Sequence, residues 1–185
     1  ETGVDAIDRL AAGHDPLDRC GRGADAVHAG VVQLGGNALP KLAELQTNLI
    51  LSHSAGLGDP LPRHVTRLMI VLKLLGLGRG YSGVRPLVID ALQSLVDKDA
   101  MPLIPAQGSV GASGDLAPLA HLIAALLGEG RIDVAGEILP AKDALSKLGM
   151  SPLELGPKEG LALINGTQAS SAIALDALFA AERVF

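Results

Sequence analysis

The sequence predicts a mainly α-helical protein with one small β-hairpin. Leucine and alanine recur at helical spacing through most of the chain, and glycine or proline stands where these patterns break. The composition agrees, because 48% of the residues are hydrophobic and only 2% are aromatic, and small apolar side chains suit closely packed helices. A chain of 185 residues can bury one sizeable core, so we expect a single domain over residues 1–185.

The expected helices follow one another with short breaks. The first covers residues 4–12 and precedes a loop rich in glycine and aspartate over residues 14–23. In residues 40–55, Leu45 and Leu49 belong to an apolar series that falls on one side of a helix. The other expected helices cover residues 62–75, 86–99, 115–127, 141–148 and 166–185.

Local signals mark several helix ends. Gly76 and Gly78 are stop signals for the helix before them. Asp115 is placed as the N-cap of the helix expected over residues 115–127, and Pro118 lies in the first turn of that helix, where proline is tolerated. Asn165 stands where the N-cap of the last helix belongs.

One segment departs from helical patterning. Within residues 131–139, the β-branched residues Ile132, Val134 and Ile138 surround Gly136. Alternating β-branched residues around a glycine are typical of two short strands and a tight turn. We therefore expect a small hairpin there.

Composition and charge exclude several classes of function. The net charge of −5 and the absence of a basic patch make nucleic-acid binding an unsuitable interpretation. No targeting segment is visible, and the longest apolar stretches are shorter than the ~20 residues of a bilayer-spanning helix, so no membrane partner is expected. The single cysteine, Cys20, allows no intrachain disulfide and fits a cytoplasmic protein. No metal site is expected.

The run from Gly108 to His121 carries the chemistry. It places Ala112, Ser113 and Gly114 in a loop of small residues before an apolar helix. A ring closes if the amide nitrogen of Gly114 attacks the carbonyl carbon of Ala112, and small side chains leave room for that approach. Loss of the Ser113 hydroxyl as water then leaves an exocyclic methylene, which is a strong electron sink. The positive end of the following helix faces this ring.

Two other interpretations of this loop are weaker. A phosphate-binding loop needs a Lys-Ser or Lys-Thr pair after its glycines or the spacing Gly-x-Gly-x-x-Gly, and neither is present in the run from Gly108 to His121. A simple tight turn explains the glycines but not the rest of the run.

The whole run from Gly108 to His121 resembles the signature of the histidine and aromatic amino-acid ammonia-lyases. The resemblance implies a helical domain in which Ala112, Ser113 and Gly114 condense to the cofactor 4-methylidene-imidazol-5-one (MIO). It also implies that Asp115 assists ring formation.

A second segment, from Leu45 to Gly56, is similar to the substrate pocket of the same family. Its Ser52-His53 pair resembles the form found in the histidine-specific members, which implies that L-histidine is the substrate and that His53 orients the imidazole ring. A tyrosine or phenylalanine lyase, or an aminomutase, is disfavoured by this pair alone. Without the surrounding match, a hydrogen-bonded histidine on a helix would be the default interpretation of His53.

Two further segments carry the resemblance. Residues 79–85 are similar to a family turn between helices near the active site, with arginines that we interpret as structural. Residues 158–168 resemble a second hallmark, in which the Asn165 amide binds the MIO or the substrate amine. Capping of the last helix by Asn165 is the simpler alternative, and both roles can coexist.

The implied reaction is the non-oxidative elimination of ammonia from L-histidine to give trans-urocanate. The substrate amine attacks the methylene carbon derived from Ser113, the β-proton is lost, and ammonia leaves. The family implies a homotetramer whose active sites are each assembled from several subunits.

The sequence departs from the family pattern in two ways. The family loop Tyr-Gly-x-x-Thr-Gly-Phe-Gly, whose tyrosine is the expected base, has no counterpart over residues 27–37, and the one tyrosine is Tyr81. His28 has a suitable pKa for a base, but a surface histidine is the better interpretation.

The resemblance also covers only the N-terminal, MIO-bearing part of the family, with residues 1–40 weakly matched. We therefore expect the helix over residues 166–185 to present an apolar face. A catalytically impaired or inactive truncated homologue that serves as a helical association module is the alternative function.

Overall fold

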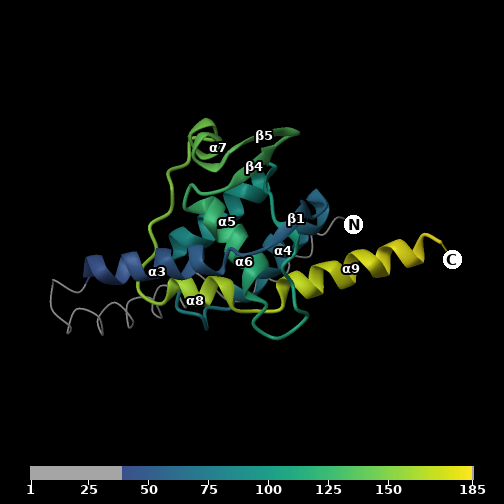
Figure 1. Ribbon diagram of the computed structural model, residues 1–185, viewed down its shortest axis with the longest axis horizontal. Coiled ribbons are helices and arrows are strands. Elements are labelled where there is room, and N and C mark those ends of the chain that lie inside the picture. The colour runs from purple at the N-terminus through teal and green to yellow at the C-terminus, as the bar shows by residue number, and fades with distance from the viewer. Residues whose placement is uncertain (1–38, 185) are drawn as a thin grey trace.

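The computed structural model describes residues 39–184, and this part of the chain is mainly α-helical, as predicted (Figure 1). The segments expected over residues 4–12 and 14–23 lie outside the described residues, as do Cys20 and His28. The helices are α3 (Leu39–His53), α4 (Arg63–Leu77), α5 (Pro86–Asp97), α6 (Leu116–Leu126), α7 (Ala141–Lys147), α8 (Glu159–Ile164) and α9 (Gln168–Glu182). The strands are β1 (Leu57–Pro60), β2 (Ala100–Pro102), β3 (Pro105–Gln107), β4 (Arg131–Val134) and β5 (Glu137–Pro140).

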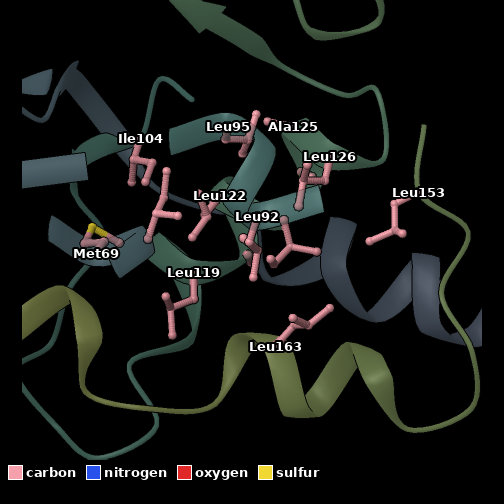
Figure 2. Packing of buried hydrophobic residues seen from close by; sticks show 14 of the residues in the cluster. Met69, Leu92, Leu95, Ile104, Leu119, Leu122, Ala125, Leu126, Leu153 and Leu163 are labelled. Atoms are coloured by element: carbon pink, nitrogen blue, oxygen red, sulfur yellow. The ribbon is translucent and has the colours of Figure 1, made fainter. Parts of the chain in front are cut away.

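Helix α6 is the centre of the core. Its sequence is apolar on every side, and a helix of that kind is stable only when other elements surround it. Accordingly it packs against α3, α7 and α8, and most of its residues are buried. Figure 2 shows its side chains Leu119, Leu122 and Leu126 in one cluster with Leu92 of α5 and Leu163 of α8. The N-terminus of this rigid helix fixes the position of the loop before it.

Within residues 39–184 the predicted helices are confirmed, with small differences at most of their ends. Two of these differences concern the ends of α4 and α5. Gly76 is not a stop signal, since α4 continues through it to Leu77 and ends at Gly78. A Cβ atom on Gly76 would lie 3.7 Å from Nε2 of Gln168, which is an ordinary van der Waals distance to the start of α9. Helix α5 ends at Asp97, and Asp99 with φ +50° has already left the helix.

The predicted hairpin is confirmed as β4 and β5, which pair in antiparallel register. Ala135 and Gly136 at its turn both have positive φ, which is the geometry of a tight type I′ turn. Strand β2 adds to β4 and makes a three-stranded sheet in the order β2-β4-β5. Strand β2 and the separate pair β1-β3 were not predicted, because these strands are three or four residues long and each contains a proline.

The end of the chain differs from expectation in one respect. Asn165 is not the N-cap of the last helix: it follows α8, a short helix that the sequence analysis missed, and α9 begins at Gln168. As expected, α9 exposes apolar side chains, among them Leu178 and Phe179, and its far end extends away from the other helices in Figure 1. Over residues 39–184, no helix is long and apolar enough to cross a membrane.

Candidate active site

The loop over residues 108–115, here called the site loop, joins β3 to α6 and closes around one buried carboxylate. Asp115 is fully buried, its Oδ1 accepts a hydrogen bond from the Val110 amide at 2.9 Å, and its Oδ2 accepts one from the Ser109 hydroxyl. Asp115 therefore precedes α6 as predicted, but its side chain does not cap the helix. The carboxylate holds the loop in a bend instead, because the loop amide and hydroxyl compete successfully for it.

The tip of this bend carries Ala112, Ser113 and Gly114, the residues predicted to form the ring. Ala112 and Ser113 are exposed, and Gly114 has φ +77°, a conformation that favours glycine. A Cβ atom on Gly114 would lie only 2.9 Å from Oδ1 of Asn165. Any larger residue at position 114 would therefore strain the backbone and displace the asparagine.

The turn between α8 and α9 lies directly against the site loop. Besides the approach of Asn165 to Gly114, the Asp115 amide donates to the Gly166 carbonyl at 3.2 Å. Two segments far apart in the sequence thus meet at the Gly114–Asp115 peptide. The structure brings together Gly114, Asp115 and Asn165 from the set of candidate residues.

Ser52 and His53 lie at the C-terminal end of α3. Nδ1 of His53 is 2.8 Å from the Leu49 carbonyl, which can only accept, so Nδ1 carries the proton and the neutral ring keeps Nε2 as an acceptor. The Ser52 hydroxyl donates to the same carbonyl at 3.0 Å. The helix backbone therefore fixes the orientation of the half-buried His53 ring.

The chain just after His53 contacts the site loop. A Cβ atom on Gly108 would lie 3.3 Å from Cα of Gly56, and the Gly56 amide donates to Nε2 of His121 on α6 at 2.9 Å. His121 must be neutral at Nε2 to accept this bond. It thereby ties the end of the His53 segment to the helix that carries the site loop.

The bond from Gly56 to His121 predicts a pH dependence of stability. Burial lowers the pKa of His121 below its ordinary value of 6.5. The unfolded state therefore binds the proton more tightly, so the contribution of His121 is complete above pH 6.5 and is lost as the pH falls below it. We expect the free energy of unfolding in urea, measured relative to a His121→Gln variant, to decrease between pH 7.5 and pH 5.

The His121→Gln variant is the matched control, since glutamine offers a carbonyl acceptor that does not titrate, while the rest of the chain is the same in both proteins. A difference in unfolding free energy that stays constant with pH would contradict this role for His121.

Sequence reasoning missed a buried ion pair beside α8. Both carboxylate oxygens of Glu159 receive hydrogen bonds from the Arg85 guanidinium, at 2.9 and 2.7 Å, and others from the Arg85 and Gly156 amides. Burial opposes ionisation of Glu159, but these hydrogen bonds together lower its pKa. The structural role expected for the arginines of residues 79–85 is thus fulfilled by Arg85, and only its buried partner was not foreseen.

Two more buried polar groups support α8 and were missed. Gln46 of α3 accepts a hydrogen bond from the Gly160 amide at 3.0 Å. Lys73 of α4 is 2% exposed and donates to the carbonyls of Ala162 and Asn165 at 2.9 and 3.1 Å. A polar residue inside an apolar helical pattern was the available signal for Lys73.

Tyr81 is 77% exposed, with the Arg79 guanidinium carbon 6.0 Å from its ring centroid. Within residues 39–184, no group of three or more histidine, cysteine, aspartate or glutamate residues could hold a metal ion.

The sequence model of the family described as aromatic amino acid lyase matches residues 8–185. The chain belongs to this family. Since the match includes the site loop, α8 and α9, the contacts described above lie within the family's shared region.

Its relatives include histidine ammonia-lyases. The chain is 59% identical over 145 residues to the enzyme of Paracidovorax citrulli (strain AAC00-1). The aligned residues make up 78% of this chain and 28% of that protein. It is 50% identical over 182 residues to the enzyme of Burkholderia mallei (strain NCTC 10229), covering 97% of this chain and 36% of that protein. The chain thus spans about a third of the length of these relatives.

The fold is similar to that of a solved family member. The crystal structure of histidine ammonia-lyase from Trypanosoma cruzi superposes with a TM-score of 0.84 and 34% sequence identity, over 93% of this chain and 35% of that one.

Proposed function

We propose that this chain carries the electrophile-forming part of a histidine ammonia-lyase, which eliminates ammonia from L-histidine to give trans-urocanate. Curated relatives with that name at 50% and 59% identity support the choice within the family. The observation that carries the proposal is the packing of Gly114, at φ +77°, against the Asn165 amide on a bend closed by Asp115.

The residues present fit the MIO group. Ring closure joins the Gly114 nitrogen to the Ala112 carbonyl carbon, and two water molecules leave, one from that carbonyl and one from the Ser113 hydroxyl. The left-handed Gly114 and the hydrogen bonds from Ser109 and Val110 to Asp115 bend the chain in the sense that this closure needs. Asp115 would assist closure by holding the bend.

The chemistry at this site needs few protein groups. Once formed, the ring would supply an electrophilic methylene carbon, and this chemistry would make the substrate amine a better leaving group. Asn165, whose Oδ1 faces Gly114, would hold the ring or the amine through its amide.

The reaction breaks the Cα–N bond, removes a β-proton and forms a double bond between Cα and Cβ. Ser52 and His53 would bind the substrate side chain. With Nδ1 committed to the Leu49 carbonyl, Nε2 of His53 is the atom that would accept a hydrogen bond from an imidazole N–H. A phenyl ring offers no such donor, which favours L-histidine over L-phenylalanine. As the family resemblance implies, the protein would act as a homotetramer. It would be located in the cytoplasm.

The test is an intact mass measurement followed by an assay. We expect the purified protein to be lighter than its sequence by two water molecules, with the deficit in the peptide that contains residues 112–114. We expect L-histidine, rather than L-phenylalanine or L-tyrosine, to yield a product with the ultraviolet absorbance of urocanate. A mass equal to that of the unmodified sequence would support the alternative function as an association module. Formation of aromatic acrylates from L-phenylalanine or L-tyrosine would instead assign one of these amino acids as the substrate.

A further inference from the structure

Lys73 is a buried cation whose bonds all lead to the turn beside the site loop. It projects from α4, is 2% exposed, and donates to the carbonyls of Ala162 and Asn165. These carbonyls lie at the C-terminal end of α8, where the last backbone acceptors of a helix have no partner within the helix. A cation is favoured at that end by the helix dipole.

Lys73 is costly to keep buried. In the described part of the chain no carboxylate forms an ion pair with it, and burial lowers its pKa to about 8. Burying an ammonium group without a counter-charge is unfavourable, and an apolar side chain of similar length would fill the space without that cost. Apolar packing therefore gives no reason for a lysine at this position, and the hydrogen bonds to the Ala162 and Asn165 carbonyls are what the ammonium contributes.

The turn that Lys73 holds makes both contacts to the site loop. Its residue Asn165 places Oδ1 against Gly114, and its residue Gly166 accepts the Asp115 amide at 3.2 Å. The Lys73 ammonium is bonded to the carbonyl of Asn165 itself, so one peptide link separates the cation from the acceptor of the Asp115 amide.

We propose that Lys73 is a positioning residue that fastens the turn of Asn165 and Gly166 and thereby holds the Ala112–Gly114 loop in the geometry for ring closure. The inference rests on the proposed function. Ring closure needs the Gly114 nitrogen aimed at the Ala112 carbonyl carbon, and a misplacement of about 1 Å in such a site can cost about 10²-fold in rate. Without the ammonium, the Ala162 and Asn165 carbonyls lose their shared donor and the turn can shift.

The experiment compares Lys73→Met with the conservative Lys73→Arg and with Lys98→Met. Lys98 is the control: it is exposed and also donates to a backbone carbonyl, that of Leu148 at 2.6 Å, outside the turn and the site loop. Two quantities are measured: hydrogen exchange of the Asp115 amide, and the rate at which newly made protein loses two water molecules from the peptide of residues 112–114.

We expect Lys73→Met to speed exchange of the Asp115 amide at least tenfold, while amides inside α6 keep their protection. We expect it to slow the loss of water about 10²-fold. Lys73→Arg, which keeps the charge and the donors, should recover most of both effects, and Lys98→Met should behave like the wild type. A merely structural role would change the protection of α6 and the Asp115 amide together.

Equal exchange and equal ring closure in Lys73→Met and Lys98→Met would overturn the proposal. If Lys73→Met does not fold, Lys73→Gln takes its place: the ring-closure rate should then decrease from wild type through arginine to glutamine, and three equal rates would overturn it. If the wild type itself never loses water, the proposed function fails, whereas exchange of the Asp115 amide still decides the role of Lys73.

Discussion

Replacement of Ser113 by alanine is expected to abolish turnover of L-histidine and leave the fold intact. Ser113 is the only source of the methylene carbon in the proposed chemistry, so its loss removes the covalent route entirely. The loss of rate should exceed the ~10²- to 10⁴-fold typical of removing one general acid or base. The side chain is exposed at the tip of the site loop, so the free energy of unfolding should change by less than about 0.5 kcal/mol.

The measurement combines the urocanate assay, the intact mass and urea unfolding. The Ser113→Ala protein should show the full mass of its sequence, without the deficit of two waters. Ser151→Ala, at an exposed serine of the segment between α7 and α8, is the control and should retain both the deficit and the activity. Persistent turnover by Ser113→Ala would exclude an electrophile made from this residue.

Replacement of Glu159 by alanine is expected to give a large loss of stability. Its carboxylate is 3% exposed and accepts hydrogen bonds from the Arg85 guanidinium and from the amides of Arg85 and Gly156. Removing it leaves these donors without an acceptor, which should lower the free energy of unfolding by about 3 kcal/mol. The Arg85 side chain is 38% exposed and can regain some hydration, so the loss should stay below the upper end for buried pairs.

The matched control is Glu137→Ala, which removes the carboxylate of an exposed ion pair with Lys147 and should cost about 0–1 kcal/mol. The pKa of Glu159 is lowered from 4.5, so its contribution should be complete above that pH and decline as the pH falls below it. Equal losses in the two variants under urea unfolding at pH 7 would show that the buried pair contributes no more than the surface pair.

The helices could be predicted because their apolar patterns are long and regular. Apart from His121, residues 116–126 are apolar in every direction, and this property indicates a central helix. The strands β1 to β3 could not be predicted, because they are short and their pairing depends on residues far away in the sequence. Asn165 was misassigned as a cap, since a six-residue helix before it carries too little pattern to be recognised.

The residues proposed to carry the chemistry could be chosen from the sequence, whereas the residues that support them could not. Ala112, Ser113 and Gly114 stand out by composition and by resemblance. Lys73 bonds to residues 89 or more positions away, and the Arg85 partner of Glu159 is 74 positions away; such contacts leave no local pattern. Asp115 is intermediate: its place before α6 was predicted, but its bonds to Ser109 and Val110 depend on how the loop bends.

The contact between the Asp115 amide and the Gly166 carbonyl has a consequence for biosynthesis. The ribosome makes the loop well before it makes the turn, and the emerging chain cannot form this contact until Gly166 has left the exit tunnel. If this contact is needed to complete the bend, the nascent chain does not form the reactive alkene while its apolar segments are still exposed to solvent. Translation order would then delay the self-modification until the polypeptide has folded around it.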